Sequence, residues 1–411
     1  MPPHQDTLVK STVVPFEPAA LPAQLKRLGH HDVLERWRAV DRSAHDPHIV
    51  AVVGDDGEDW AAAALVTARP HTAYLKIVDA VGDVPAAVEA VVAHARNREL
   101  AQVKWEGWTV TPEAAATAGF APLSPPLTHA EGASGPGAGH VRWLHDDAVD
   151  EPPYYGQTTH FTCGAVTALV AQAHEGRLPK ESFDRRAELT LWRDATNFPA
   201  CEPVGLGVAV RRAWPSSQVT VFLDVDRPVL LGHYPQDEQE WRAVLQEASR
   251  AEAGRVGVPI DSQHLSMTAI RSALGRREHV LLLVSLAEMQ GFDVPHWVLC
   301  HSAVPGAVVI EDPWTNTAAG DTWVDAHLLP VPTPSLDAMS TISPDGFRGA
   351  VIIGSPEPRT VLPPEPGAWD EGRHKPGADR LRAPSPHPHV RSICDRRDGL
   401  VAYIGSGQSS V

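Results

Sequence analysis

The chain has 411 residues, of which 43% are hydrophobic and 21% are charged, and its formal net charge is -16. This length and apolar content favour about two or three domains with real cores. Because no run of Lys or Arg offsets the negative charge, we expect neither nucleic acid nor an anionic membrane as a partner.

The cysteines and the N-terminus bear on the compartment. Four Cys residues and no CxxC pair argue against a disulfide framework and against a structural zinc site, so reduced thiols are expected. The N-terminus lacks a basic region followed by an apolar core, and no stretch approaches the roughly 18 apolar residues of a membrane span. We therefore expect a cytoplasmic protein. Its oligomeric state is not indicated.

The first third of the chain alternates short strands and helices. Residues 1–24 are Pro-rich and expected to be extended, and a helix interrupted near Gly29 is predicted over 25–40. Strands are predicted over 48–53 and 61–68, joined by an Asp-Gly turn. A strand (AYLKIVDAV), a helix opening at Asp83-Val84-Pro85, a strand over 102–105 and a short helix in TPEAAATAGFAPL follow.

This order of elements, with the terminal Gly119-Phe120, resembles the GNAT acetyltransferase fold. In that family a Gly-rich run opening the central helix binds the pyrophosphate of acetyl-CoA through backbone N–H groups. Here the corresponding stretch is DAVGDVP, with one Gly, a Pro that removes a donor and two Asp that repel phosphate. We expect residues 25–125 to form a small α/β, degenerate GNAT-like domain that needs no cofactor.

A Gly/Ser/Pro-rich stretch over 126–150 is predicted to be a linker. After it, the sequence GQTTHFTCGAVTALVAQAHEG reads as a polar turn feeding a helix, with Thr162 at the N-cap and Gly176 at the C-cap. Cys163 then lies in the first helical turn, where unpaired N–H groups and the helix dipole favour the thiolate. A buried structural Cys is the alternative interpretation.

Gln157 stands six residues before Cys163. Its side-chain amide and the backbone N–H of Cys163 are suited to stabilise an oxyanion. A Cys at a helix start with a Gln at this spacing resembles the papain-like cysteine peptidases.

The next segment is predicted to be helical and then to change to strands. The apolar pattern of Leu189, Leu191, Trp192 and Phe198 predicts a second helix, and PVGLGVAVRRAWP a third. Strands are predicted in QVTVFLDVD and RPVLLGHY, and a polar helix in QDEQEWRAVLQEASRAEAG. A further helix is predicted in IDSQHLSMTAIRSALGRR, and the apolar run HVLLLVSL predicts a central strand.

The sequence PHWVLCHSAVPGAVVIEDPW predicts a β-hairpin that turns at VPG. With the turn centred on Val304, His296 lies directly opposite Asp312, about 5 Å away on the same face. A carboxylate beside an imidazole fixes its tautomer and supports its positive charge. The alternative is that His296 and Asp312-Pro313 only mark strand ends.

Together these features resemble the bacteriocin-leader (double-glycine) peptidase-like branch of the papain superfamily. More closely, they resemble bacterial proteins in which a GNAT-like domain precedes such a domain. The resemblance covers residues 151–355 and implies an α+β, papain-like fold with a helical part and an antiparallel sheet. It implies that Cys163 is the nucleophile, His296 the general base and acid, Asp312 the orienting residue and Gln157 the oxyanion donor.

Cys201 precedes a helix and is the alternative nucleophile, but no Gln or Asn stands at the oxyanion spacing before it. Cys300 and His301 share no common centre with His296 in a strand, so no metal is expected. Residues expected to line a substrate cleft or shield the site are His160, Tyr155, Trp297 and Trp314.

Residues 356–390 are Pro-rich and predicted to form a linker, and residues 391–411 are predicted to form one C-terminal hairpin. The function expected from the whole sequence is a cysteine-dependent hydrolase that cleaves an amide or peptide bond through an acyl-enzyme. Its substrate would be a peptide or a small amide. Two alternatives stay open, an acyl transferase that uses the same site and a non-catalytic binding module.

Overall fold

A computed structural model describes residues 10–107, 110–127, 137–195, 199–232, 234–342 and 346–354. All of them fall within one compact unit of the chain, Met1–Arg359. None of the helices in these ranges combines the length and apolarity needed to cross a membrane. The Pro-rich segment and the hairpin predicted for 356–411 lie outside the described residues.

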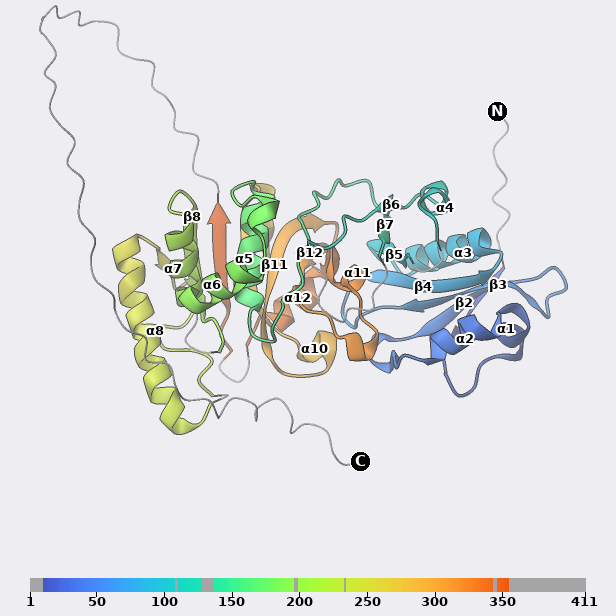
Figure 1. Cartoon of the computed structure of the whole chain (residues 1–411), viewed down its shortest axis with the longest axis horizontal. Coiled ribbons are helices and arrows are strands. Elements are labelled where there is room, and N and C mark those ends of the chain that lie inside the picture. Colours follow the sequence, from blue (N-terminus) through green and yellow to red (C-terminus); the bar gives the residue numbers. More distant parts are fainter. Residues whose placement is uncertain are drawn as a thin grey trace, which may run out of the picture. The chain divides into compact units, whose positions relative to one another are not determined.

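The first sheet has the strand order β1-β2-β3-β4-β5-β7-β6. Its strands are Ser11–Pro15 (β1), His48–Val53 (β2), Trp60–Thr67 (β3), Tyr74–Gly82 (β4), Gln102–Glu106 (β5), Ala121–Pro122 (β6) and Gly139–Trp143 (β7). Only β4 and β5 pair in parallel, and α3 (Val84–Asn97) connects them. Helix α3 covers one face of the sheet, while α1 (Ala23–Leu28) and α2 (His31–Arg38) lie on the other (Figure 1).

Local sequence signals account for this half well. Gly29 separates α1 from α2, and Asp83 caps α3 by accepting a hydrogen bond from the backbone N–H of Ala86. The helix predicted near residue 112 is α4 (Pro112–Thr117). The linker prediction is wrong for residues 139–143, because β7 pairs with the free edge of β5 and buries His140 and Val141.

The second sheet has the order β13-β12-β11-β10-β14-β8-β9. Its strands are Gln218–Leu223 (β8), Ile260–Asp261 (β9), His279–Ser285 (β10), Pro295–Val304 (β11), Ala307–Glu311 (β12), Leu329–Pro332 (β13) and Gly349–Gly354 (β14). All neighbours are antiparallel except β8 and β9. The predicted central strand is β10, whose alternate residues enter two separate cores: Leu281 and Leu283 one, Val280 and Leu282 the other.

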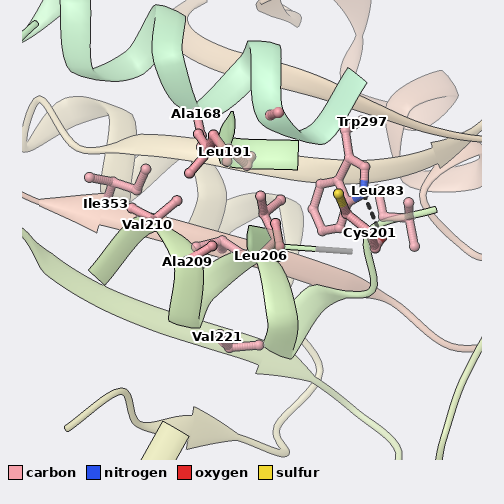
Figure 2. Packing of buried hydrophobic residues seen from close by; sticks show 14 of the residues in the cluster. Ala168, Leu191, Cys201, Leu206, Ala209, Val210, Val221, Leu283, Trp297 and Ile353 are labelled. Carbon is pink, nitrogen blue, oxygen red and sulfur yellow. Dashed lines mark hydrogen bonds between the residues drawn. The ribbon is translucent and has the colours of Figure 1, made fainter. Parts of the chain in front are cut away.

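Helices cover both faces of the second sheet. The larger core joins one face to α5 (Cys163–His174), α6 (Arg185–Ala195) and α7 (Pro203–Ala213). Within it, the indole N–H of Trp297 donates to the carbonyl of Cys201 at 3.0 Å (Figure 2). The other face packs on α9 (Met267–Gly275) and α12 (Thr333–Met339). The remaining helices are α8 (Gln236–Val256), α10 (Ala287–Gln290), α11 (Trp323–Ala326) and the 3-10 turns η1 (Ser43–His45), η2 (Lys180–Ser182) and η3 (Thr317–Ala319).

Two predicted elements in this half are wrong. RPVLLGHY forms no strand in its described residues, because the side-chain amide of Gln246 in α8 bonds both the N–H and the carbonyl of Val229, each at 2.8 Å. The helix predicted from Ile260 begins only at Met267, where Ser266 caps it, and residues 260–261 pair with β8 instead. Phe198 of the predicted second helix lies outside the described residues. The structure is thus a mixed α+β fold with two mixed sheets.

Candidate active site

Cys163 is the first residue of α5, as predicted. The hydroxyl of Thr162, at the N-cap, does not cap the helix and instead contacts Glu188. The first-turn N–H groups therefore stay available to a negative charge at Cys163. Cys163 is 9% exposed.

The environment of Cys163 favours the thiolate. Burial raises the pKa of Cys163. The charge of His296, a hydrogen bond from its side chain and backbone N–H groups of Trp297 and Gly164 act against burial, and the net effect is a lowered pKa. A lowered pKa places more of the sulfur in its nucleophilic form near neutral pH.

His296 lies near the start of β11 and is 4% exposed. Its Nε2 donates to Oδ1 of Asp312 at 2.8 Å, which leaves Nδ1 for the hydrogen bond with Cys163. Burial lowers the pKa of His296, but the charges of Asp312 and Cys163 raise it to about 10. The imidazole is thus held as a cation beside the sulfur.

The hairpin brings His296 and Asp312 together, but not in the predicted register. The turn lies at Pro305-Gly306, so Val304 pairs with Ala307, and a bulge between Cys300 and Ser302 shifts the ladder again. Strand β12 ends at Glu311, one residue before Asp312. Asp312 therefore reaches the imidazole from the loop after the strand and not as a cross-strand partner.

Several groups fix the Asp312 carboxylate, which is fully buried. Oδ1 also accepts from the backbone N–H of Trp314 at 2.9 Å, and Oδ2 accepts from Arg69 at 2.6 Å. Burial raises the pKa of Asp312, while the charges of His296 and Arg69 lower it further than burial raises it. Asp312 therefore stays ionised beside His296.

Gln157 is hydrogen-bonded to the loop that carries Asp312. Its backbone N–H donates to the carbonyl of Pro313 at 2.7 Å, and its side-chain Nε2 donates to the carbonyl of Thr159 at 2.7 Å. An amide nitrogen carries two N–H groups, so one is left for a substrate oxygen. The structure places Gln157 in the nucleophile loop with its amide turned toward Thr159.

Glu188 of α6 is a site residue that the sequence analysis did not single out. Its buried carboxyl group accepts from the hydroxyl of Tyr155 at 3.0 Å, from the N–H and hydroxyl of Thr158 at 2.8 and 2.9 Å, and from the hydroxyl of Thr162. These bonds hold the loop that leads into Cys163. The available signal was spacing, because Glu188 shares a helix face with the buried residues Leu191 and Ala195.

The predicted cleft residues differ in placement. Tyr155 is buried, bonds Glu188 and stacks on Phe183 with ring centroids 4.4 Å apart, so it is a packing residue and the cleft role expected for it is not supported. His160 is exposed in the nucleophile loop. Trp297 packs into the core, whereas Trp314 is half-buried and contacts Phe292.

The other thiols are core residues. Cys201 is 3% exposed and Cys300 is fully buried, and burial raises the pKa of Cys300 far above its ordinary value. Within the ranges that the structure describes, no three His, Cys, Asp or Glu side chains are arranged to hold a metal ion. Cys163 combines a lowered pKa with a charged partner, His296.

Two solved acetyltransferase structures are similar to part of the chain. Nourseothricin acetyltransferase is 19% identical over 24% of this chain and 66% of its own, with a TM-score of 0.20. The ribosomal-protein-S18-alanine N-acetyltransferase from Escherichia coli is 12% identical over 34% of this chain and 98% of its own, with a TM-score of 0.24. Both TM-scores are too low to define a fold.

No curated protein matches the sequence. Residues 152–354, which carry Cys163, His296, Asp312 and Gln157, match the model of a family described as "Peptidase_C39 like family". This match points to an enzyme of the cysteine peptidase kind.

Proposed function

We propose that the protein is a papain-like cysteine hydrolase that cleaves an amide or peptide bond through an acyl-enzyme on Cys163. The observation that carries the proposal is the continuous hydrogen-bonded series from Cys163 through His296 to Asp312. The family match over residues 152–354 supports the same chemistry.

In the proposed reaction the Cys163 thiolate attacks the substrate carbonyl, and the negative charge moves to its oxygen. The backbone N–H of Cys163 and the remaining side-chain N–H of Gln157 stabilise that oxyanion. His296 then donates its Nδ1 proton to the leaving amine, and the acyl group stays on sulfur. His296 next takes a proton from water, which attacks the thioester and releases the acid.

Asp312 orients the imidazole throughout. Because Nε2 donates to Asp312 at 2.8 Å, the other ring nitrogen is the one that exchanges the proton with sulfur and leaving group. The contact between Nε2 and Asp312 supports this division of roles between the two ring nitrogens.

An activated ester tests the proposal without knowledge of the natural substrate. Incubation with p-nitrophenyl acetate should add one acetyl group to Cys163, seen by intact-mass and peptide mass spectrometry, with a burst of p-nitrophenol. We expect Cys163→Ala to lose both signals and His296→Ala to acylate much more slowly. Acetylation that falls on other residues, or that is equal in His296→Ala, would refute the proposal.

A further inference from the structure

We infer that Arg69, which belongs to the first sheet's half of the chain, is a positioning residue of the candidate active site. This inference rests on the proposed function and deepens it. In it, a side chain outside residues 152–354 completes the Cys163–His296–Asp312 site.

Arg69 follows β3 and is held rigidly in its turn. Its carbonyl accepts from the Thr72 hydroxyl at 2.6 Å, and the neighbouring N–H of Ala68 donates to the carbonyl of His45 at 2.9 Å. The Arg69 side chain is completely buried. A long cationic side chain enclosed in this way needs anionic partners to offset the loss of water.

Its guanidinium spans two carboxylates of the second half. One terminal nitrogen donates to Oδ2 of Asp312 at 2.6 Å, and the other donates to Oδ2 of Asp321 at 2.8 Å and to the carbonyl of Trp314 at 3.3 Å. The planar, forked geometry of Arg suits such a bridge better than the single head of Lys. Arg69 thus fixes the angle of the carboxylate whose other oxygen holds His296.

Asp321 anchors the far side of the bridge. Its carboxylate also accepts from the backbone N–H of Asn316 at 3.0 Å and from the side chain of Gln290 at 3.2 Å, and it lies 3.2 Å from Nδ1 of His45. Because Asp321 is held from several sides, the position of Arg69 is set independently of Asp312. Asp321 thus positions Arg69, Arg69 positions Asp312, and Asp312 positions His296.

The positive charge of Arg69 also affects the titration of Asp312. The charge of Arg69 lowers the pKa of Asp312, so it extends to lower pH the range in which Asp312 supports the His296 cation. The other titratable groups facing this bridge from the packed elements are His45, Tyr74, Lys104, Tyr154, Asp321 and Asp325.

Lys76 of β4 provides a matched control. It is as buried as Arg69 and forms ion pairs with Glu106 at 2.6 Å and with Asp325, but it does not contact Asp312. Lys76→Met and Arg69→Met each remove one buried cation. Only Arg69→Met removes a contact to the orienting carboxylate.

The test is the rate of Cys163 alkylation by iodoacetamide between pH 4 and 9 in the full chain, with a thermal melt of every variant. The acid limb of this pH profile is the range in which the labelling rate falls as the pH drops. We expect the acid limb of Arg69→Met to lie about one pH unit above that of the wild type. We expect Lys76→Met to keep the wild-type limb despite a lower melting temperature. In an Asp312→Asn background, Arg69→Met should produce no further shift.

Arg69→Lys serves if Arg69→Met does not fold, because it keeps the charge but cannot span both carboxylates. Its acid limb should shift in the same direction by a smaller amount. A wild-type limb in Arg69→Met, or in Arg69→Lys if only that variant folds, would overturn the inference and leave the proposed function intact. An ordinary thiol profile in the wild type would instead refute the proposed function.

Discussion

Glu188 gives the sharpest prediction about how the site is built. Its carboxyl group accepts four hydrogen bonds from the segment 155–162, and it has no solvent exposure. In Glu188→Ala all four donors lose this acceptor. A buried donor without a partner costs about 1–3 kcal/mol. Since Thr158 is half-buried, water recovers part of that cost.

We therefore expect Glu188→Ala to lower the free energy of unfolding by about 3–5 kcal/mol. For a chain of this size that corresponds to a fall of roughly 4–6 °C in melting temperature. The loop before Cys163 should also move, so iodoacetamide labelling of Cys163 at pH 6 should slow about tenfold, equivalent to one unit of thiol pKa.

The assay is differential scanning calorimetry together with labelling kinetics of the folded protein. Asp194→Asn is the control, because Asp194 lies on the same helix but is exposed and pairs only loosely with Arg193, at 3.6 Å. That variant should remain within about 0.5 kcal/mol of the wild type. A Glu188→Ala protein that melts and labels like the wild type would refute the role given to Glu188.

Three further predictions concern the triad, the packing and the pH dependence. Asp312→Asn removes the larger of the two charges, Asp312 and Cys163, that raise the pKa of His296, so labelling at pH 6 should fall at least about tenfold. An unchanged rate would contradict this. Gly164→Ala places a methyl group 3.0 Å from Cδ1 of Trp297 and should lower the free energy of unfolding, measured with denaturant, by about 1–3 kcal/mol. The added methyl group of Gly254→Ala meets open space in α8, so that variant should raise the free energy of unfolding by about 0.5–1 kcal/mol. Burial lowers the pKa of His301 below its unfolded value near 6.5, so the unfolded chain binds more protons at this residue. The free energy of unfolding should therefore fall as the pH drops below about 6.5. His301→Gln should flatten that pH dependence in urea titrations, and an unchanged slope would contradict this prediction.

Local signals in the sequence were enough to place Cys163. The N-cap position of Thr162, the helical spacing after it and Gly176 at the end all describe one helix, and α5 begins where these signals put it. The same holds for β10, whose uninterrupted apolar run suits a strand buried on both faces. In these elements the local sequence and the tertiary packing favour the same structure.

Contacts between distant segments were beyond the sequence. The partners His296 and Asp312 were identified, yet their register was wrong because the turn lies at Pro305-Gly306 and not at Val304. A β-bulge between Cys300 and Ser302, which has no clear signature in the sequence, shifts the ladder once more. Arg69 was missed, since its partner Asp312 lies 243 positions away along the chain. RPVLLGHY has a strand-like composition, but the amide of Gln246 satisfies its backbone at Val229 in place of a neighbouring strand.

The central claim is that Cys163 and His296 form a thiolate–imidazolium pair. The most direct measurement is the rate of Cys163 alkylation by iodoacetamide at pH 6, by peptide mass spectrometry, in the wild type and in His296→Ala. We predict rapid labelling of Cys163 in the wild type and its loss in the variant, with Cys300 unlabelled in both. Slow labelling in both proteins, rising only toward an ordinary thiol pKa of about 8.5, would contradict the claim.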